Sequence, residues 1–167
     1  MCVSVPRDPA SVLTWHAAQL TPGASHRADT GVARAGGKGL NVARVAHAQG
    51  GDVIAVTTAG GPTGAEFAAE LATSGVPHVL VPVAAATRRS IALVDEALGD
   101  TTIVNERGVT PTADEWQALQ DAAAAAVADA RVLVISGSLP PGAPADALAR
   151  LIRMGRDAGA AVIADTS

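Results

Sequence analysis

The segment Ala-Gly-Gly-Lys-Gly-Leu-Asn-Val-Ala-Arg-Val at residues 35–45 joins a glycine-rich loop to a helical pattern. It places bare backbone, the only lysine of the chain (Lys38) and Asn41 where a helix begins. Unpaired N–H groups and partial positive charge at a helix N-terminus suit the binding of phosphate or polar hydroxyl groups. Gly37 and Gly39 lack the Cβ atoms that would hold a ligand away from the backbone. The spacing alone is consistent with a ligand-binding loop and with an ordinary glycine-rich turn.

A second polar segment, Ile-Ser-Gly-Ser-Leu-Pro-Pro-Gly, spans residues 135–142. It follows the apolar run Val132–Ile135, which is typical of a strand buried on both faces of a parallel sheet. In open parallel sheets, ligands bind beyond the carboxyl ends of the strands. We therefore expect Ser136 and Ser138 to offer hydroxyl groups at such an edge, although a plain strand-to-helix connection also uses glycine and proline.

Two common nucleotide-binding motifs are absent from the sequence. Lys38 is followed by Gly39, so there is no G-x-x-x-x-G-K-[ST] loop with a hydroxyl group for magnesium. The pattern G-x-G-x-x-G does not occur either, which disfavours a Rossmann-type dinucleotide module. Any ligand of the glycine loop must therefore be bound by another scheme.

The bulk composition restricts the class of protein. The chain has 167 residues, of which 49% are hydrophobic, enough for one domain with its own core. Its net charge of −4 comes from 12 basic and 16 acidic residues that are interspersed, and only 2% of the residues are aromatic. We therefore expect no nucleic-acid partner. A single cysteine and the lack of a long apolar run predict a cytoplasmic protein with no membrane partner, no internal disulfide and no metal ligands.

Apolar runs alternate with amphipathic segments along most of the chain. The expected strands are Cys2–Val5, Val53–Thr57, Val79–Val83 and two buried strands, Val132–Ile135 and Ala161–Ala164. The expected helices follow the glycine loop, cover Gly64–Thr73, begin at the capping-box pair Thr112 and Glu115, and run from Pro144 to about Asp157. This alternation predicts an α/β fold with a parallel sheet flanked by helices.

Two stretches do not follow this alternation. Val12–His16 and Arg88–Asn105 show polar alternation, and the second stretch is typical of a hairpin with one solvent-facing side. Their β-branched residues favour a small β layer, a candidate lid, over an irregular surface excursion. We therefore expect a single domain, with a core at about 1–10, 36–84 and 108–167 and a β lid at about 11–35 and 85–107.

Several segments carry a resemblance to a known family. They are AGGKGLNVARV at 35–45, Gly60–Gly64, TRRS at 87–90, Val109–Pro111, ISGSLPPG at 135–142 and the ending Val162–Ser167. In this order, and over the whole chain, they resemble the ribokinase-like (PfkB) carbohydrate kinases. The branch that they resemble contains 1-phosphofructokinase, tagatose-6-phosphate kinase and the minor 6-phosphofructokinase.

The resemblance implies a ribokinase-like fold in which a β lid covers the sugar and often helps to form a homodimer. It implies transfer of the γ-phosphoryl group of ATP, with Mg²⁺, to a hydroxyl group of a phosphorylated ketohexose. The substrate-binding residues that it implies are Gly37, Lys38, Gly39, Asn41, Arg88 and Ser138. Of these, Arg88 would face the phosphate of the substrate. Arg27 stands where the family often has a basic residue, and is either a phosphate contact or a solvated surface charge.

The chain also departs from the family pattern. Val12 stands where the family has an aspartate that binds sugar hydroxyl groups, and Ser90 stands in place of a lid asparagine. The Gly-Ala-Gly-Asp segment with the catalytic aspartate, the nucleotide pocket and the segment that supports Mg²⁺ do not occur in these 167 residues. We therefore expect an incomplete domain, the sugar-binding half of a kinase, with no catalytic residue of its own. The alternative is an inactive remnant that binds sugar phosphate or only pairs through its lid.

Overall fold

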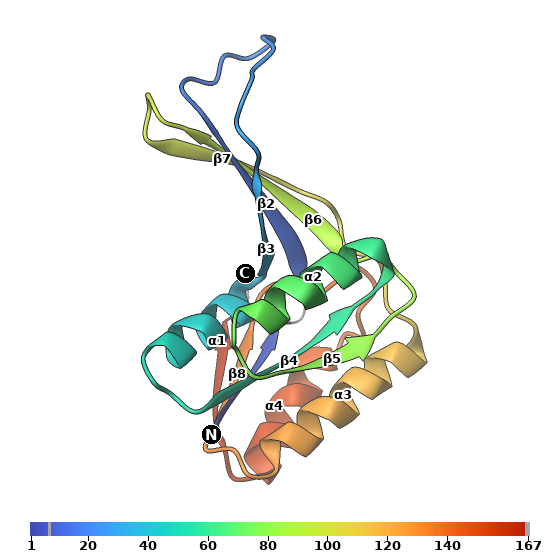
Figure 1. The fold of residues 1–167 in the computed structure, drawn as a ribbon. Helices are drawn as coiled ribbons and strands as arrows, with labels where there is room; N and C mark the ends of the chain where they lie inside the picture. The colour runs from blue at the N-terminus through green and yellow to red at the C-terminus, as the bar shows by residue number, and fades with distance from the viewer. Residues whose placement is uncertain (7, 166–167) are drawn as a thin grey trace.

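The computed structural model describes residues 1–6 and 8–165, which form two β-sheets and four helices (Figure 1). In these residues the first sheet has five strands in the order β5-β4-β1-β8-β9, and every neighbouring pair is parallel. The strands are β1 (Cys2–Pro6), β4 (Val53–Ala59), β5 (His78–Pro82), β8 (Val132–Ser136) and β9 (Ala161–Asp165). The predicted α/β architecture is therefore confirmed.

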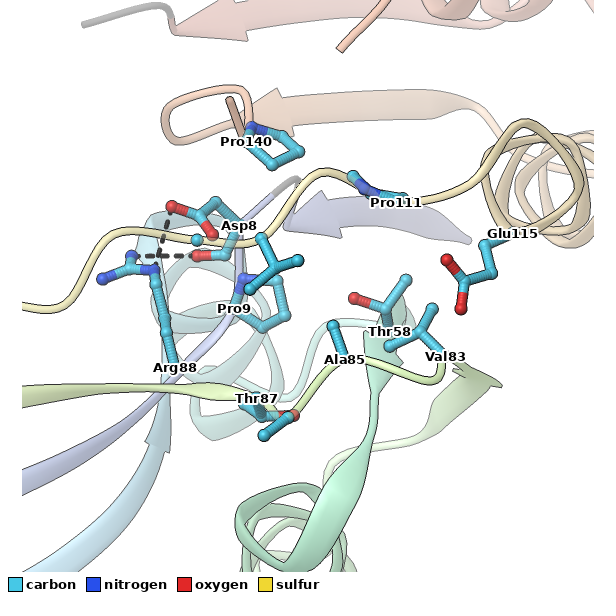
Figure 2. A pocket seen from close by; sticks show the side chains of 13 residues that line it. Asp8, Pro9, Thr58, Val83, Ala85, Thr87, Arg88, Pro111, Glu115 and Pro140 are labelled. Atoms are coloured by element: carbon cyan, nitrogen blue, oxygen red, sulfur yellow. Dashed lines mark hydrogen bonds and ion pairs between the residues drawn. The ribbon is translucent and has the colours of Figure 1, made fainter. Parts of the chain in front are cut away.

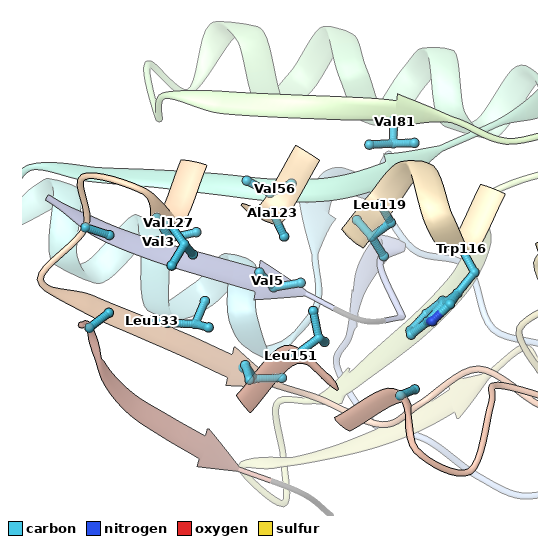
Figure 3. Close-up of a cluster of buried hydrophobic side chains, with 14 residues drawn as sticks. Val3, Val5, Val56, Val81, Trp116, Leu119, Ala123, Val127, Leu133 and Leu151 are labelled. Carbon is cyan, nitrogen blue, oxygen red and sulfur yellow. The ribbon is translucent and has the colours of Figure 1, made fainter. Parts of the chain in front are cut away.

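Helices cover both faces of this sheet (Figure 1). On one face lie α1 (Lys38–Ala48) and α2 (Gly61–Thr73), and on the other lie α3 (Ala113–Val127) and α4 (Ala147–Asp157). The side chains of β1 alternate between the two layers, as the pleat of a strand requires. Val3 and Val5 join the apolar cluster beneath α3 and α4 (Figure 3). The intervening Ser4 points to the other layer, where its hydroxyl donates to the Gly39 carbonyl of α1 at 2.6 Å.

A second sheet extends away from the first (Figure 1). Its order is β3-β2-β6-β7, with β2 and β6 parallel and the two outer pairs antiparallel. These strands are β2 (Ala10–Ala17), β3 (Val32–Gly36), β6 (Arg88–Asp95) and β7 (Asp100–Asn105). The hairpin predicted within 88–105 is confirmed as β6 and β7. The expectation of a single solvent-facing side was wrong for β7, because this edge strand is exposed at every residue.

The element boundaries differ from the predicted ones at several points. The strand β3 was not predicted, and α2 begins at Gly61, before the predicted start at Gly64. The helix α4 begins at Ala147, because residues 144–146 form a turn in which the Ala147 N–H donates to the Pro144 carbonyl.

The strand β9 was expected to be buried but is mostly exposed, because it lies at the edge of the sheet and pairs with β8. The predicted ending includes Thr166 and Ser167, which lie outside the described residues.

The described residues include neither a membrane-spanning helix nor a cluster of metal-ligating side chains. No helix in the described part of the chain combines the length and the apolarity needed to span a membrane. No group of three or more His, Cys, Asp or Glu side chains in residues 1–6 and 8–165 is placed to hold a metal ion.

The start of α3 confirms the predicted capping box. The Thr112 hydroxyl accepts from the Glu115 N–H, and the Glu115 carboxylate accepts from the Thr112 N–H at 2.7 Å. The second carboxylate oxygen accepts from the Ala84 N–H at 2.6 Å, in the connection between β5 and β6. These N–H groups, Ala84 first, hold the pKa of Glu115 below its ordinary value, because they stabilise the charged form. Glu115 therefore ties α3 to the chain segment that leads into the second sheet.

We predict that Glu115 makes the stability of the fold pH-dependent. Because its pKa is lower in the folded state, its contribution is fully present above the ordinary value of 4.5 and is lost as the pH falls through the folded pKa. Urea unfolding between about pH 6 and about pH 3 measures this effect. Glu115→Gln should be less stable than the wild type at pH 6 and should lose less stability on acidification. The matched control is Asp129→Asn, an exposed position just beyond α3, and equal slopes for all three proteins would contradict the prediction.

Candidate functional site

A cleft of about 590 Å³ lies between the carboxyl ends of β1 and β8, the start of α1 and the second sheet. Among the sequence-predicted site residues it is lined by Gly37, Lys38, Asn41, Arg88 and Ser138. These residues come from three separate segments of the chain. The fold therefore brings most of the predicted set to one place, at the edge of the sheet where open parallel sheets bind ligands.

The glycine loop turns into α1 where the sequence predicted. Gly37 is the N-cap residue with φ of 123°, a conformation that favours glycine, and the Asn41 N–H donates to its carbonyl at 3.0 Å. Gly36 packs closely against β2, because a Cβ atom there would lie 2.5 Å from a methyl group of Val12, which would have to move. Gly39 is buried behind the loop, against Ser4, and does not line the cleft.

A half-buried ion pair fixes the loop from behind. The Glu70 carboxylate of α2 accepts from the Ala35 N–H at 2.8 Å and pairs with the Arg44 guanidinium of α1. Arg44 also donates to the Ala35 carbonyl at 3.1 Å. The backbone N–H and carbonyl groups of Ala35 thus each have a charged partner, one from each of two helices. Such hydrogen bonds are strong, and they fix the end of β3 relative to α1 and α2.

Arg88 projects into the boundary between the two sheets, where it meets Asp8 (Figure 2). Its Nε atom lies 2.9 Å from Asp8 Oδ2, and its Nη2 atom donates to the Asp8 carbonyl at 3.1 Å. Both side chains are 15% exposed. The Nε–H is nevertheless not aligned with the carboxylate, so this buried donor makes no hydrogen bond. Asp8 was missed as a site residue, although its place directly after the first strand of the parallel sheet was a usable signal.

The same ion pair borders a second hollow. A cavity of about 50 Å³ lies between the loop after β5, the start of α3 and the segment after β1 (Figure 2). Asp8, Arg88 and Gly108 line both this cavity and the larger cleft. The Ser138 hydroxyl donates to Asp8 Oδ2 at 3.4 Å from the cleft side. Asp8 therefore connects the predicted phosphate-facing arginine to the predicted substrate-side serine.

The two departures from the family pattern, Val12 and Ser90, lie opposite each other in the second sheet and both line the cleft. The Ser90 hydroxyl donates to Asn105 Oδ1 at 2.7 Å, and Arg88 Nη1 approaches the same oxygen at 3.5 Å. An asparagine amide is therefore present beside position 90, supplied by β7. Asn105 was not predicted, because the pairing of Ser90 with Asn105 depends on the hairpin register and leaves no local sequence signal.

Lys38 and Ser136 meet at the end of β9. The Lys38 Nζ atom lies 3.8 Å from Asp165 Oδ2, and the Ser136 hydroxyl donates to the same oxygen at 3.2 Å. Arg27, in contrast, is exposed in the connection between β2 and β3 and does not line the cleft.

The segments Gly60–Gly64 and Thr87–Ser90, which are far apart in the sequence, hydrogen-bond to each other. Thr87 donates its N–H to the Gly60 carbonyl at 2.8 Å and accepts the Gly60 N–H on its hydroxyl at 3.1 Å. The Thr63 hydroxyl donates to the Thr87 carbonyl at 2.6 Å. Thr87 and Thr63 are buried. This contact joins the start of α2 to the start of β6 and fixes the backbone next to Arg88.

Comparison with known proteins decides the family. Residues 8–167 match the sequence model of the pfkB family of carbohydrate kinases. The chain belongs to the pfkB family of carbohydrate kinases. The pfkB resemblance drawn from the motifs is therefore confirmed, and with it the fold class.

Several pfkB relatives are phosphofructokinases. The chain is 38% identical over 132 residues to ATP-dependent 6-phosphofructokinase isozyme 2 of Mycobacterium tuberculosis, over 79% of this chain and 39% of that protein. It is 34% identical over 165 residues to 1-phosphofructokinase of Xanthomonas campestris, over 99% of this chain and 52% of that protein. The structure resembles phosphofructokinase-2 from Escherichia coli in complex with fructose-6-phosphate, with a TM-score of 0.89, 30% identity, and coverage of 100% of this chain and 55% of that one. The chain thus spans about half or less of the length of these relatives.

We predict that the Thr87 contact stabilises the fold and orients Arg88. Thr87→Val keeps the side-chain shape but leaves the Gly60 N–H without its acceptor, which should lower the free energy of unfolding by about 1–3 kcal/mol. Denaturant titration measures this change. The control is Thr73→Val on α2, where an exposed hydroxyl donates within its own helix and the effect should stay within about 0.5 kcal/mol. Equal effects at the two positions would contradict a special role for Thr87.

Proposed function

We propose that this chain forms the acceptor-sugar half of an ATP-dependent kinase that phosphorylates a phosphorylated ketohexose. The observation that carries the proposal is the convergence of Arg88, the α1 N-terminus and Ser138 on one cleft of about 590 Å³. This volume is in the usual range for small-molecule sites, about 300–1,000 Å³. The phosphofructokinase names of the relatives support the substrate class.

Each part of the cleft has a chemical role in this proposal. The Arg88 guanidinium suits phosphate oxygens, because its planar set of N–H donors forms paired, charge-assisted hydrogen bonds. The Asn41 amide and the N–H groups of the first turn of α1 suit sugar hydroxyl groups. Lys38 adds positive charge at the same helix end, and Gly37 lets the ligand approach the backbone.

The reaction in this proposal transfers the terminal phosphoryl group of ATP to a sugar hydroxyl. A bond forms between the hydroxyl oxygen and the γ-phosphorus, the bond from that phosphorus to ADP breaks, and the hydroxyl proton passes to a base. The residues of this chain bind and orient the acceptor, and none of them is assigned to that base, to ATP or to Mg²⁺. The alternative, an inactive module that binds sugar phosphate, is favoured by one observation: Val12 lines the cleft and offers no hydrogen-bond acceptor to a sugar hydroxyl group.

The second sheet gives the proposal a quaternary component, a homodimer formed through the lid. Its support is the exposure of large apolar side chains on the second sheet and its turns, namely Val32, Leu98, Ile103 and Val104. Large apolar side chains in contact with water gain free energy when a partner covers them. Sedimentation velocity over a range of concentrations tests this component, and a monomer throughout would rule it out.

We predict that Arg88 binds the phosphate group of the acceptor. Calorimetric titration of the full-length protein with fructose 6-phosphate should show saturable binding, and Arg88→Gln should weaken it by about 10- to 100-fold, the value of a charge-assisted hydrogen bond. The control is Arg89→Gln, because the neighbouring side chain approaches Glu66 and does not line the cleft. A coupled kinase assay with fructose and tagatose phosphates then separates the kinase from the inactive module. Absence of binding to every sugar phosphate would refute both.

A further inference from the structure

Asp8 is the one acidic side chain that directly contacts the proposed phosphate-binding arginine within the described residues. Its carboxylate lies 2.9 Å from Arg88 Nε, and its backbone carbonyl accepts from Arg88 Nη2 at 3.1 Å. Asp8 lies between β1 and β2, and Arg88 begins β6, the strand that pairs with β2. The carboxylate thus occupies a guanidinium face that an anionic ligand would need.

The contact is close but imperfectly directed. The Arg88 Nε–H makes no hydrogen bond in spite of its short distance to the carboxylate, and Nη1 reaches Asn105 Oδ1 only at 3.5 Å. A tetrahedral anion can present several oxygens to these donors, whereas the tethered carboxylate cannot be aligned with them all. Arg88 is therefore charge-neutralised by Asp8 without being saturated as a hydrogen-bond donor.

The surroundings of the pair leave little excess positive charge in the cleft. Lys38, at the helix end, lies 3.8 Å from Asp165 Oδ2. The adjacent Glu106 and Arg107, of opposite charge, both line the cleft. An uncharged polyol can enter such a balanced site without loss of an ion pair. An anion gains the attraction of Arg88 only to the extent that the Asp8 carboxylate gives way, because like charges at this distance repel.

We infer that Asp8 is a specificity-determining residue: its carboxylate acts as an internal competitor for Arg88, so that phosphorylated ligands bind more weakly than the arginine alone would allow. The inference rests on the proposed function for its ligand class, a phosphorylated sugar. It assigns Asp8 a selective role toward anions, with no effect on an uncharged sugar. A purely structural ion pair would show no such selectivity.

The test compares anionic and neutral ligands on charge variants of the full-length protein. Asp8→Asn keeps the shape of the side chain and removes its charge, and Asp8→Ser removes the carboxylate with a smaller side chain. Both should bind inorganic phosphate and fructose 6-phosphate at least about tenfold more tightly than the wild type in calorimetric titrations at low salt, and fructose with unchanged affinity. The control is Asp157→Asn, an exposed position at the end of α4, which makes the same change in net charge and should leave all affinities unchanged.

The outcomes separate this inference from the proposed function. Unchanged or weaker phosphate binding by the two Asp8 variants overturns the inference, as does an equal gain for fructose or for Asp157→Asn. If the Asp8 variants gain affinity for inorganic phosphate while no protein binds a sugar phosphate in preference to it, the inference stands and the proposed function fails. If fructose 6-phosphate binds tightly to the wild type and no more tightly to the variants, the proposed function stands and the inference fails.

The unmodified protein gives a second measurement that does not depend on the folding of a variant. Phosphate titration followed by NMR should shift the Asp8 carboxyl-carbon signal and the Arg88 Nε signal along the same saturation curve, because one event frees the carboxylate and engages the guanidinium. A shift at Arg88 with no change at Asp8 would show that phosphate binds without displacing the carboxylate, and would overturn the inference.

Discussion

The position of the second sheet over the cleft depends on the mutual hydrogen bonding of Gly60 and Thr87. Each donates its N–H to the other residue. Thr63 of α2, the helix that begins directly after Gly60, adds a third hydrogen bond to the Thr87 carbonyl. Because these groups are buried or half-buried, breaking one leaves a polar atom without water to replace its partner. Arg88 directly follows Thr87, so the backbone from which its side chain extends is fixed against the start of α2. The ion pair with Asp8 adds a second contact to Arg88, from the segment that leads into β2.

The elements that could be predicted are those whose signals are local. The structure confirms the capping box at Thr112 and Glu115 and the buried strand at 132–135. Both could be predicted because the signal for a helix cap or a doubly buried strand lies in neighbouring residues. The strand Val32–Gly36 gave no such signal, since its alanine and glycine residues have low strand preference and β2 supplies its pairing. The exposure of Ile163 could not be read from its apolar neighbours either, because burial of a strand depends on its place in the sheet.

The candidate site divides in the same way. Gly37 and Asn41 could be placed from the loop-to-helix pattern, and Arg88 and Ser138 from motif order, and all four line the cleft. The pairing of Asp8 with Arg88 joins residues 80 positions apart, and the contact of Ser90 with Asn105 follows from the register of a hairpin. Neither contact can be recognised from a pattern of adjacent residues. The sequence therefore indicated four residues that line the cleft, and the fold was needed to find the carboxylate that contacts Arg88.

The close approach at Gly60 has an evolutionary consequence. A Cβ atom at this position would lie 2.2 Å from the carbonyl oxygens of both Val83 and Ala85. The backbone of the β5–β6 connection therefore occupies the space that any other side chain would need. A substitution of Gly60 therefore requires a different backbone path in the connection at 83–87, so the two segments are expected to change together. A change in either segment is constrained by the backbone of the other.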